Sequence, residues 1–192
     1  MTRTNNRALA NYPNNAVSVL DFGAVGDGVT DDTSAIQAAF DYGFANGNTV
    51  VIPSGTYITS KALKVYGGNS TGADELPGLN IQGDSKGGSL ILKTSHTPLG
   101  NGSAHDVNAI MIVCNSSWRT GTINTTDRIR NIKLSDFSLR GGGDTLPDYG
   151  IYTADGTFTN SRLESLTVGD FNESGIQSVS YTHLRAHETM VD

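Results

Sequence analysis

The sequence is poor in cysteine, in aromatic residues and in positive charge, and each shortage excludes a class of protein. Its 13 Lys and Arg residues face 19 Asp and Glu residues, which gives a net charge of −6 over 192 residues. Nucleic acids and anionic membrane surfaces bind basic surfaces, so we expect neither as a partner. An anionic ligand would need a local cluster of Lys and Arg, and none stands out along the sequence.

Cysteine and long apolar runs are also scarce. The single cysteine, Cys114, excludes an internal disulfide and a cysteine metal cluster, and we predict neither a metal site nor a cofactor. No apolar run is long enough for a signal peptide or for a membrane span. If the protein acts outside a cell, we expect it to leave by lysis, by a dedicated machine or as part of a particle.

Glycine is abundant, with 23 residues, and short apolar runs separated by Gly, Asn, Asp and Ser recur along the chain. The first clear example is Thr49–Ile52, followed by Pro53, a Ser-Gly corner and Thr56–Thr59. This rhythm predicts many short strands joined by sharp turns. A β-sandwich and a parallel β-solenoid both fit such a pattern.

One segment has the pattern of a helix. Ile36, Phe40 and Phe44 recur at every fourth position and predict one apolar stripe, and the helix stops at Asn46-Gly47. About 14 residues at about 1.5 Å each make a rod of about 21 Å, long enough to cover one end of a solenoid. Because terminal coils need such a cover, the helix favours the solenoid over the sandwich.

Three aspartates near this helix are candidate catalytic carboxylates. Asp27 lies in a glycine-rich loop, and Asp31 and Asp32 directly precede the helix. Glycoside hydrolysis needs two carboxyl groups across a groove, whereas these positions suit loop bracing and N-capping. We therefore predict that all three are structural. Their spacing does not match a calcium-binding loop.

A weak internal repeat relates residues 131–137 to residues 165–171. It places Asp136 and Asp170 at equivalent positions, where a solenoid would stack them on one face along a sugar-binding surface. The alternative is that each makes a turn hydrogen bond at a coil corner. Coils of roughly 25 residues would give about five coils between residues 48 and 175.

The run VLDFGAVGDGVTDDTSAIQAAF, continued by NTVVIPSGTYITSKALKV, resembles the start of pectate-lyase-superfamily β-helix domains of the rhamnogalacturonase and epimerase type, as in phage tailspike proteins. The resemblance implies an all-β fold, a right-handed single-stranded parallel β-helix with an N-terminal capping α-helix. It also implies that the parent protein degrades polysaccharide as a glycoside hydrolase or lyase, with calcium as an optional cofactor.

In a tailspike setting the resemblance further implies a homotrimer in a virion tail or another extracellular location. The NTD, GHG and RIK motifs of related polygalacturonases are missing, so no catalytic residue is carried over, and we expect this chain to be inactive. The alternative is a non-catalytic module that is structural or adheres to glycan.

The sequence divides into three parts. Residues 1–16 are rich in Asn and predict a flexible leader or attachment segment, and residues 17–178 form the predicted β-helix. Residues 179–192 lack glycine, and the run SYTHLRAHET resembles translated sequencing-adapter sequence. We therefore expect a non-native tail, and a natural chain that continues the β-helix beyond about residue 178.

Overall fold

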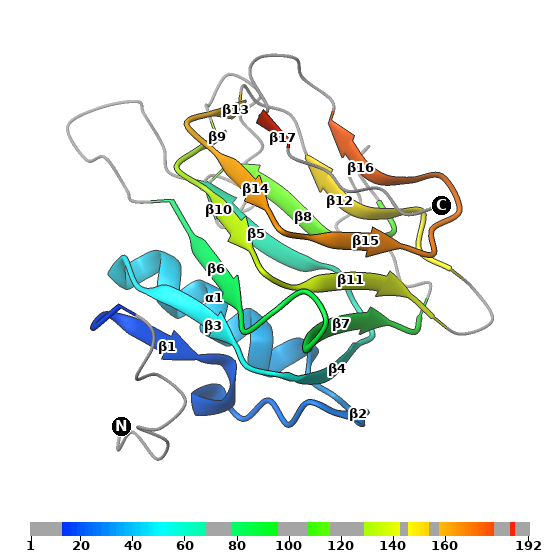
Figure 1. Cartoon of the computed structure of the whole chain (residues 1–192), viewed down its shortest axis with the longest axis horizontal. Coiled ribbons are helices and arrows are strands. Elements are labelled where there is room, and N and C mark those ends of the chain that lie inside the picture. Colours follow the sequence, from blue (N-terminus) through cyan, green and yellow to red (C-terminus); the bar gives the residue numbers. More distant parts are fainter. Residues whose placement is uncertain are drawn as a thin grey trace.

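Short parallel strands form a stack that is closed at one end by a helix (Figure 1). This computed structural model describes residues 13–67, 78–95, 107–115, 129–142, 146–153, 158–178 and 185–186. All strand pairs among these residues are parallel. Among them, no helix is long and apolar enough to cross a membrane.

The strands belong to three long sheets, which we name A, B and C. Sheet A contains β1 (Ala16–Ser18), β3 (Thr49–Ile52), β6 (Asn80–Gly83), β10 (Lys133–Ser135), β14 (Arg162–Glu164) and β17 (Arg185–Ala186). Sheet B contains β2 (Asp27–Asp31), β4 (Gly55–Thr59), β7 (Ser89–Lys93), β11 (Ser138–Gly141) and β15 (Thr167–Gly169). Sheet C contains β5 (Leu63–Gly67), β8 (Ala109–Asn115), β12 (Tyr149–Thr153) and β16 (Ser174–Ser178). A further pair joins β9 (Ile129–Arg130) to β13 (Phe158–Thr159).

The chain passes from sheet A to sheet B to sheet C and returns to sheet A, so each circuit is one rung of a right-handed parallel β-helix. This confirms the predicted fold class. Apolar side chains stack inward at matching register positions, as in sheet A, where the buried column is Val50, Ile81, Leu134 and Leu163. Such stacking buries a continuous core, because each rung covers the apolar face of its neighbour.

The rungs differ in length, and there are fewer of them than the predicted five. Strands β3, β6, β10 and β14 begin at Thr49, Asn80, Lys133 and Arg162, so the rung between β6 and β10 is much longer than its two neighbours. Four rungs in the described part have a strand in each of the three sheets, whereas about five coils were predicted. Only the paired strands must match between rungs; the connections between them are free to differ in length.

The stack is covered at its N-terminal end by α1 (Thr33–Asn46) (Figure 1). The helix contacts β1, β3 and β5. Ile36, Phe40 and Phe44, the predicted apolar stripe, are at most 2% exposed and belong to the main hydrophobic core. The helix ends at Gly47, whose φ of 65° is the left-handed conformation that glycine adopts without strain.

Three details before α1 differ from the prediction. The alternation of Val17, Val19 and Phe22 with polar residues predicts a short strand, but Val19–Phe22 form a short 3-10 helix (η1). Ser18 Oγ accepts from Leu20 N at 3.2 Å, and Ser18 N donates to Asp21 Oδ2 at 3.1 Å, so a capping box ends the strand. Residues 27–31 are not only a loop, because β2 pairs with β4, with an irregular register between Asp27 and Asp31. Ala16, which was assigned to the leader, already belongs to β1.

Lys93 closes β7 with a fully buried side chain. Its ammonium group donates to Asn108 Oδ1 at 2.8 Å and to the Ala109 carbonyl oxygen at 3.0 Å. Burial lowers the pKa of Lys93 from 10.5 to about 8, and the charge of Asp148 acts in the opposite direction. Below about pH 8 Lys93 is charged in the folded protein, and this buried charge costs desolvation free energy.

This cost predicts a pH dependence of stability. Between about pH 8 and pH 10 the unfolded chain holds a proton on Lys93 that the folded chain has lost, so the stability contribution of Lys93 rises with pH. In thermal melts across this interval, we expect the midpoint of wild type to rise relative to that of Lys93→Met, which cannot titrate there. Parallel midpoint curves for the two proteins would contradict the assignment.

Candidate functional site

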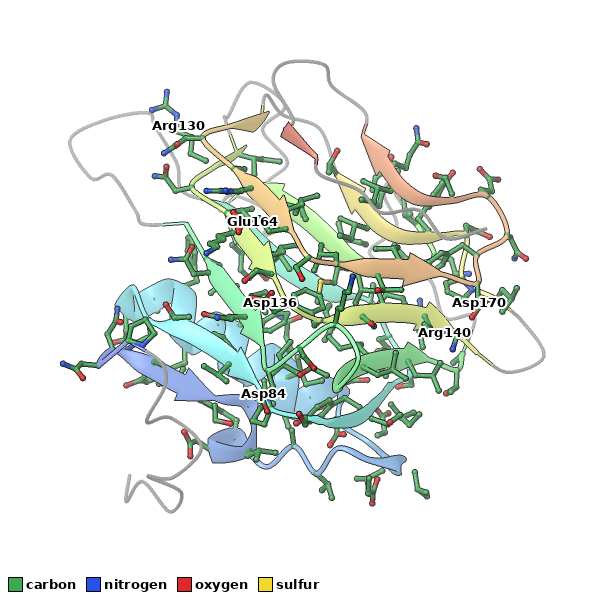
Figure 2. The ribbon with its side chains drawn as sticks, in the orientation of Figure 1. Asp84, Arg130, Asp136, Arg140, Glu164 and Asp170 are labelled. Atoms are coloured by element: carbon green, nitrogen blue, oxygen red, sulfur yellow. The ribbon has the colours of Figure 1, made fainter. Side chains whose placement is uncertain are left out.

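Asp136 and Asp170 do not stack. The parallel register pairs Lys133 with Arg162 and Ser135 with Glu164, so the position that corresponds to Asp136 in the next rung is Ser165. Asp136 lies at the corner between sheets A and B, whereas Asp170 follows β15 at the corner between sheets B and C. Figure 2 shows the two side chains well apart. Of the two alternatives for these aspartates, the register therefore excludes the stacked ladder.

Each of these aspartates shapes a corner of its rung. Their φ angles are both 64°, in the left-handed region that Asp tolerates better than most residues. The carboxylate of Asp170 binds Arg140 of the preceding rung, with Oδ2 2.7 Å from Nε and 2.5 Å from Nη2. Figure 2 shows this pair at the edge of the molecule. This ion pair links two successive rungs. The Asp170 carboxylate, which catalysis would need, is therefore already bound to Arg140.

The three aspartates near α1 bind local groups. The buried carboxylate of Asp32 accepts from Val25 N at 2.7 Å and from Gly26 N at 3.1 Å, and it makes no capping bond to α1. Asp31 accepts from Thr33 N at 3.0 Å and from Ser60 Oγ at 2.6 Å. Asp32 thus holds the glycine-rich loop, while Asp31 binds the first turn of α1 and the corner after β4.

Asp27 and Asp31 have lowered pKa values for related reasons. The pKa of Asp27 is lowered by the backbone N–H groups of Thr30 and then Val29, which donate to its Oδ1 at 2.7 and 2.9 Å. Burial raises the pKa of Asp31, but hydrogen bonds from Ser60 and Thr33 outweigh this effect and lower it. Both groups are therefore held as carboxylates, which suits bracing rather than proton donation.

The outer face of sheet A carries a column of polar side chains. The register aligns Asn80 with Lys133 and Lys133 with Arg162, and all three side chains are exposed. Adjacent rungs lie about 4.8 Å apart, so the two cations are neighbours. The sequence showed no cluster of Lys and Arg, because these two residues are a whole rung apart along the chain. The structure corrects that prediction.

One carboxylate accompanies the two cations. Glu164 Oε2 lies 4.0 Å from Lys133 Nζ, and Glu164 Oε1 pairs with Arg162 Nε. Figure 2 places Glu164 over this side of the stack. Two positive charges against one negative charge leave the column with a net positive charge, although the whole chain carries −6.

A hollow of about 350 Å³ lies beside this column. It is lined by Gly78, Asn80, Asn131, Ile132, Lys133, Asn160 and Arg162. Asn131 and Asn160 stack at the same corner of successive rungs, where Asn160 Nδ2 donates to Asn131 Oδ1 at 2.6 Å. We name these residues the sheet A groove. It combines cationic groups with amide groups that can donate and accept hydrogen bonds.

A sequence signal for this groove exists in the correct alignment. NIKLSD at residues 131–136 and NSRLES at residues 160–165 share an Asn, a cation two positions later and a Leu after that cation. The weak repeat instead aligns Asp136-Phe137 with Asp170-Phe171, a match that is easier to see in the sequence. The parallel register selects the less visible match because it keeps Leu134 and Leu163 in the core.

Sheet C carries an aromatic pair as a second candidate contact surface. The rings of Tyr149 and Tyr152 lie 5.4 Å apart at 43°, and the Tyr149 hydroxyl donates to Glu173 Oε2 at 2.7 Å. This hydrogen bond, with some burial, raises the pKa of Tyr149 to about 12. Phe158 is another aromatic residue that could form a contact surface, but its side chain lies outside the described side chains.

No group of three or more His, Cys, Asp or Glu residues that could hold a metal occurs in the described part of the chain. Cys114 is buried there, and burial raises the pKa of its thiol to about 12. Calcium in the parent protein, which the resemblance allows, stays a prediction about residues beyond this part. His183 and His187, which are four positions apart and could bind zinc only from one face of a helix, lie outside the described residues.

Comparison with known proteins shows to which family the chain is related. Residues 16–183 match the sequence profile of the family described as rhamnogalacturonase A/epimerase, pectate lyase-like. The chain belongs to this family. The pectate lyase-like family is polysaccharide-active, and relatives of this chain by sequence include a lyase, epimerases and a phage appendage protein.

Individual relatives come from both bacteria and phages. Alginate lyase 7 of Azotobacter vinelandii is 34% identical over 150 residues, which cover 77% of this chain and 13% of that protein. The pre-neck appendage protein of Bacillus phage B103 is 32% identical over 125 residues, which cover 65% of this chain and 11% of that protein. The tailspike of Acinetobacter phage vb_AbaP_AS12 has the same fold, with a TM-score of 0.65 and 23% identity over 88% of this chain and 26% of that chain. The chain thus spans about an eighth of these curated pectate lyase-like relatives.

Proposed function

We propose that this pectate lyase-like chain is the N-terminal part of a polysaccharide-degrading protein and that its sheet A groove binds the glycan. The observation that carries the proposal is the alignment of Lys133 and Arg162 beside the stacked Asn131 and Asn160. A groove that runs across successive rungs suits an extended polymer, because each rung presents similar groups at a similar place.

The chemistry of the groove favours an acidic glycan. Arg and Lys bind carboxylates through charge-assisted hydrogen bonds, and Arg does so with two parallel bonds. The amide groups of Asn80, Asn131 and Asn160 suit sugar hydroxyls, which donate and accept hydrogen bonds. Glu164 keeps the two cations in place through its ion pairs with both.

For the parent protein we propose a glycoside hydrolase or lyase of the phage tailspike type, located in a virion tail or otherwise extracellular and assembled as a homotrimer. Two facts support this proposal: the phage appendage relative and the fold shared with a tailspike. Within residues 179–192, for which we predict a non-native tail, the structure describes β17, which pairs with β14.

A binding role without cleavage is the second candidate. One relative is a pre-neck appendage protein, a name that describes a part of a phage particle and no catalytic activity. In the described part, Asp136 and Asp170 lie at different corners and Asp170 is occupied by Arg140. For this chain alone we therefore propose binding, with the cleaving residues in later rungs of the parent.

Purified chain incubated with pectin, alginate and bacterial capsules should release neither reducing ends nor unsaturated products. The reason is the dispersed placement of Asp136 and Asp170, because glycoside hydrolysis needs two carboxyl groups within about 10 Å across the scissile bond. Assays for reducing sugar and for the ultraviolet absorbance of unsaturated uronates measure this. Turnover on any of these polymers would overturn the proposed lack of catalysis.

The groove itself is tested by the double variant Lys133→Met, Arg162→Met. We expect its affinity for polygalacturonate or alginate to fall about tenfold, since two exposed ion pairs together contribute about 1.4 kcal/mol. Affinity electrophoresis in gels that contain the polymer measures the change. Lys86→Met is the matched control, because Lys86 is exposed on the turn between β6 and β7 and outside the groove.

In this experiment neutral dextran should not retard wild type. If the double variant and Lys86→Met bind polygalacturonate and alginate as wild type does, the sheet A groove is not the glycan site.

A further inference from the structure

A second hollow, of about 490 Å³, lies between α1 and the first residues of β5. Its lining is Thr33, Ser34, Gln37, Ala38 and Asp41 from α1, with Lys61, Ala62, Lys64 and Tyr66 from the corner before β5 and from β5 itself. It shares no residue with the sheet A groove. A volume of this size suits a small molecule such as a single sugar unit.

Two lysines and one aspartate, Asp41, line this hollow, so its net charge is positive. Lys61 is exposed and Lys64 is half-buried. Within the described part of the chain, neither ammonium group forms an ion pair. Asp41, the acidic residue of the lining, accepts from Gln37 Nε2 at 3.0 Å. The two cations are therefore available to a ligand.

The backbone that carries the lysines is fixed by the helix. Lys64 N donates to Gln37 Oε1 at 2.7 Å, and Gln37 Nε2 donates to the Lys64 carbonyl oxygen at 3.2 Å. Gln37 thus takes the place of a neighbouring strand at the edge of sheet C. Ser60 N, beside Lys61, donates to Thr33 Oγ1 at 2.9 Å. Such anchoring lowers the cost of ordering the site when a ligand binds.

We propose that this hollow, the cap pocket, is a binding site for a small hydroxylated anion, in which Lys61 and Lys64 hold a carboxylate or phosphate group. The Ser34 hydroxyl, which is exposed on the α1 side of the hollow, suits the polar remainder of the ligand. The two cations on the β5 side match one oxyanion, and the Ser34 hydroxyl matches a hydroxyl of a sugar. The site is separate from polymer binding along sheet A, so it adds a function to the one proposed above.

The test is titration of the purified chain with inorganic phosphate, with glucuronate and with glucose, followed by isothermal titration calorimetry. We expect saturable binding of phosphate or glucuronate and none of glucose up to about 50 mM. Lys61→Met and Lys64→Met keep the aliphatic stems, and each should weaken anion binding about fivefold. Lys86→Met is the matched control, because Lys86 is exposed and lines neither hollow, and it should leave anion binding unchanged.

The outcomes separate the source of the ligand from the existence of the site. Preference for glucuronate supports a sugar carboxylate, and preference for phosphate supports a phosphorylated ligand. Anion binding that is unchanged in both Lys61→Met and Lys64→Met overturns the proposal, as does no saturable binding of either anion. Retention by polygalacturonate should stay unchanged in these two variants, so failure of the cap pocket and failure of the sheet A groove are distinguishable. Circular dichroism melts of each variant check that it is folded.

Discussion

Phe40→Ala is expected to lower the free energy of unfolding by about 3–5 kcal/mol, the usual loss for a fully buried phenylalanine. Phe40 is 0% exposed at the centre of the apolar stripe of α1, among core residues of β3 and β5. Alanine is a good helix former, so the loss comes from packing rather than from the helix itself. Urea denaturation followed by circular dichroism measures the change.

The matched control is Tyr42→Ala, which removes an aromatic side chain from the same helix. Tyr42 is 40% exposed, and its ring lies 5.4 Å from that of Phe22. We expect a loss of about 1 kcal/mol, the contribution of one exposed aromatic contact. An equal loss for the two variants would mean that the buried face of α1 does not cover the core.

Asp32→Ala is the second variant with a large expected effect. The buried carboxylate of Asp32 accepts from the backbone of Val25 and Gly26, and the variant leaves both N–H groups without their partner. We expect a loss of about 2–3 kcal/mol, since hydrogen bonds to a charged acceptor are among the stronger ones. The loop that Asp32 holds packs closely: a Cβ on Gly26 would lie 2.8 Å from Tyr57 Cε1.

Asp27→Ala is the matched control for Asp32. Asp27 also accepts from two backbone N–H groups, those of Val29 and Thr30, but it is exposed to solvent. Water can replace its hydrogen bonds, so we expect a much smaller fall in the melting temperature than for Asp32→Ala. Equal melting temperatures of the two variants would show that the burial of Asp32 does not matter. Asp32→Asn, which keeps one acceptor oxygen, should fall between wild type and Asp32→Ala.

The helix could be predicted from the sequence because its signals are local. The spacing of Ile36, Phe40 and Phe44 sets one buried face, and Gly47 ends the helix with a left-handed φ. The sequence shows that Asp31 and Asp32 precede the helix, but it does not show which groups their carboxylates bind. Asp32 turns toward the glycine-rich loop rather than the first turn of α1, because Val25 N and Gly26 N need an acceptor there.

The groove could not be predicted in the same way. Lys133 and Arg162 become neighbours only when strands of successive rungs pair, and that pairing depends on connections of unequal length. The weak sequence repeat aligned Asp136 with Asp170 by similarity of letters, whereas the register aligns Leu134 with Leu163 in the core. Burial of apolar side chains, not similarity of polar ones, sets the register of a strand.

The sequence by itself therefore determined the class of fold, the capping helix and the family to which the chain belongs. These features depend on local periodicity, turn residues and a contiguous motif, all of which are visible along the chain. Only the tertiary structure decided which polar residues share a face, because parallel stacking brings together side chains that lie a whole rung apart along the chain. The sheet A groove and the cap pocket both depend on the tertiary structure. The groove is lined by residues of successive rungs, and the pocket is lined by α1 and by β5 at the edge of sheet C.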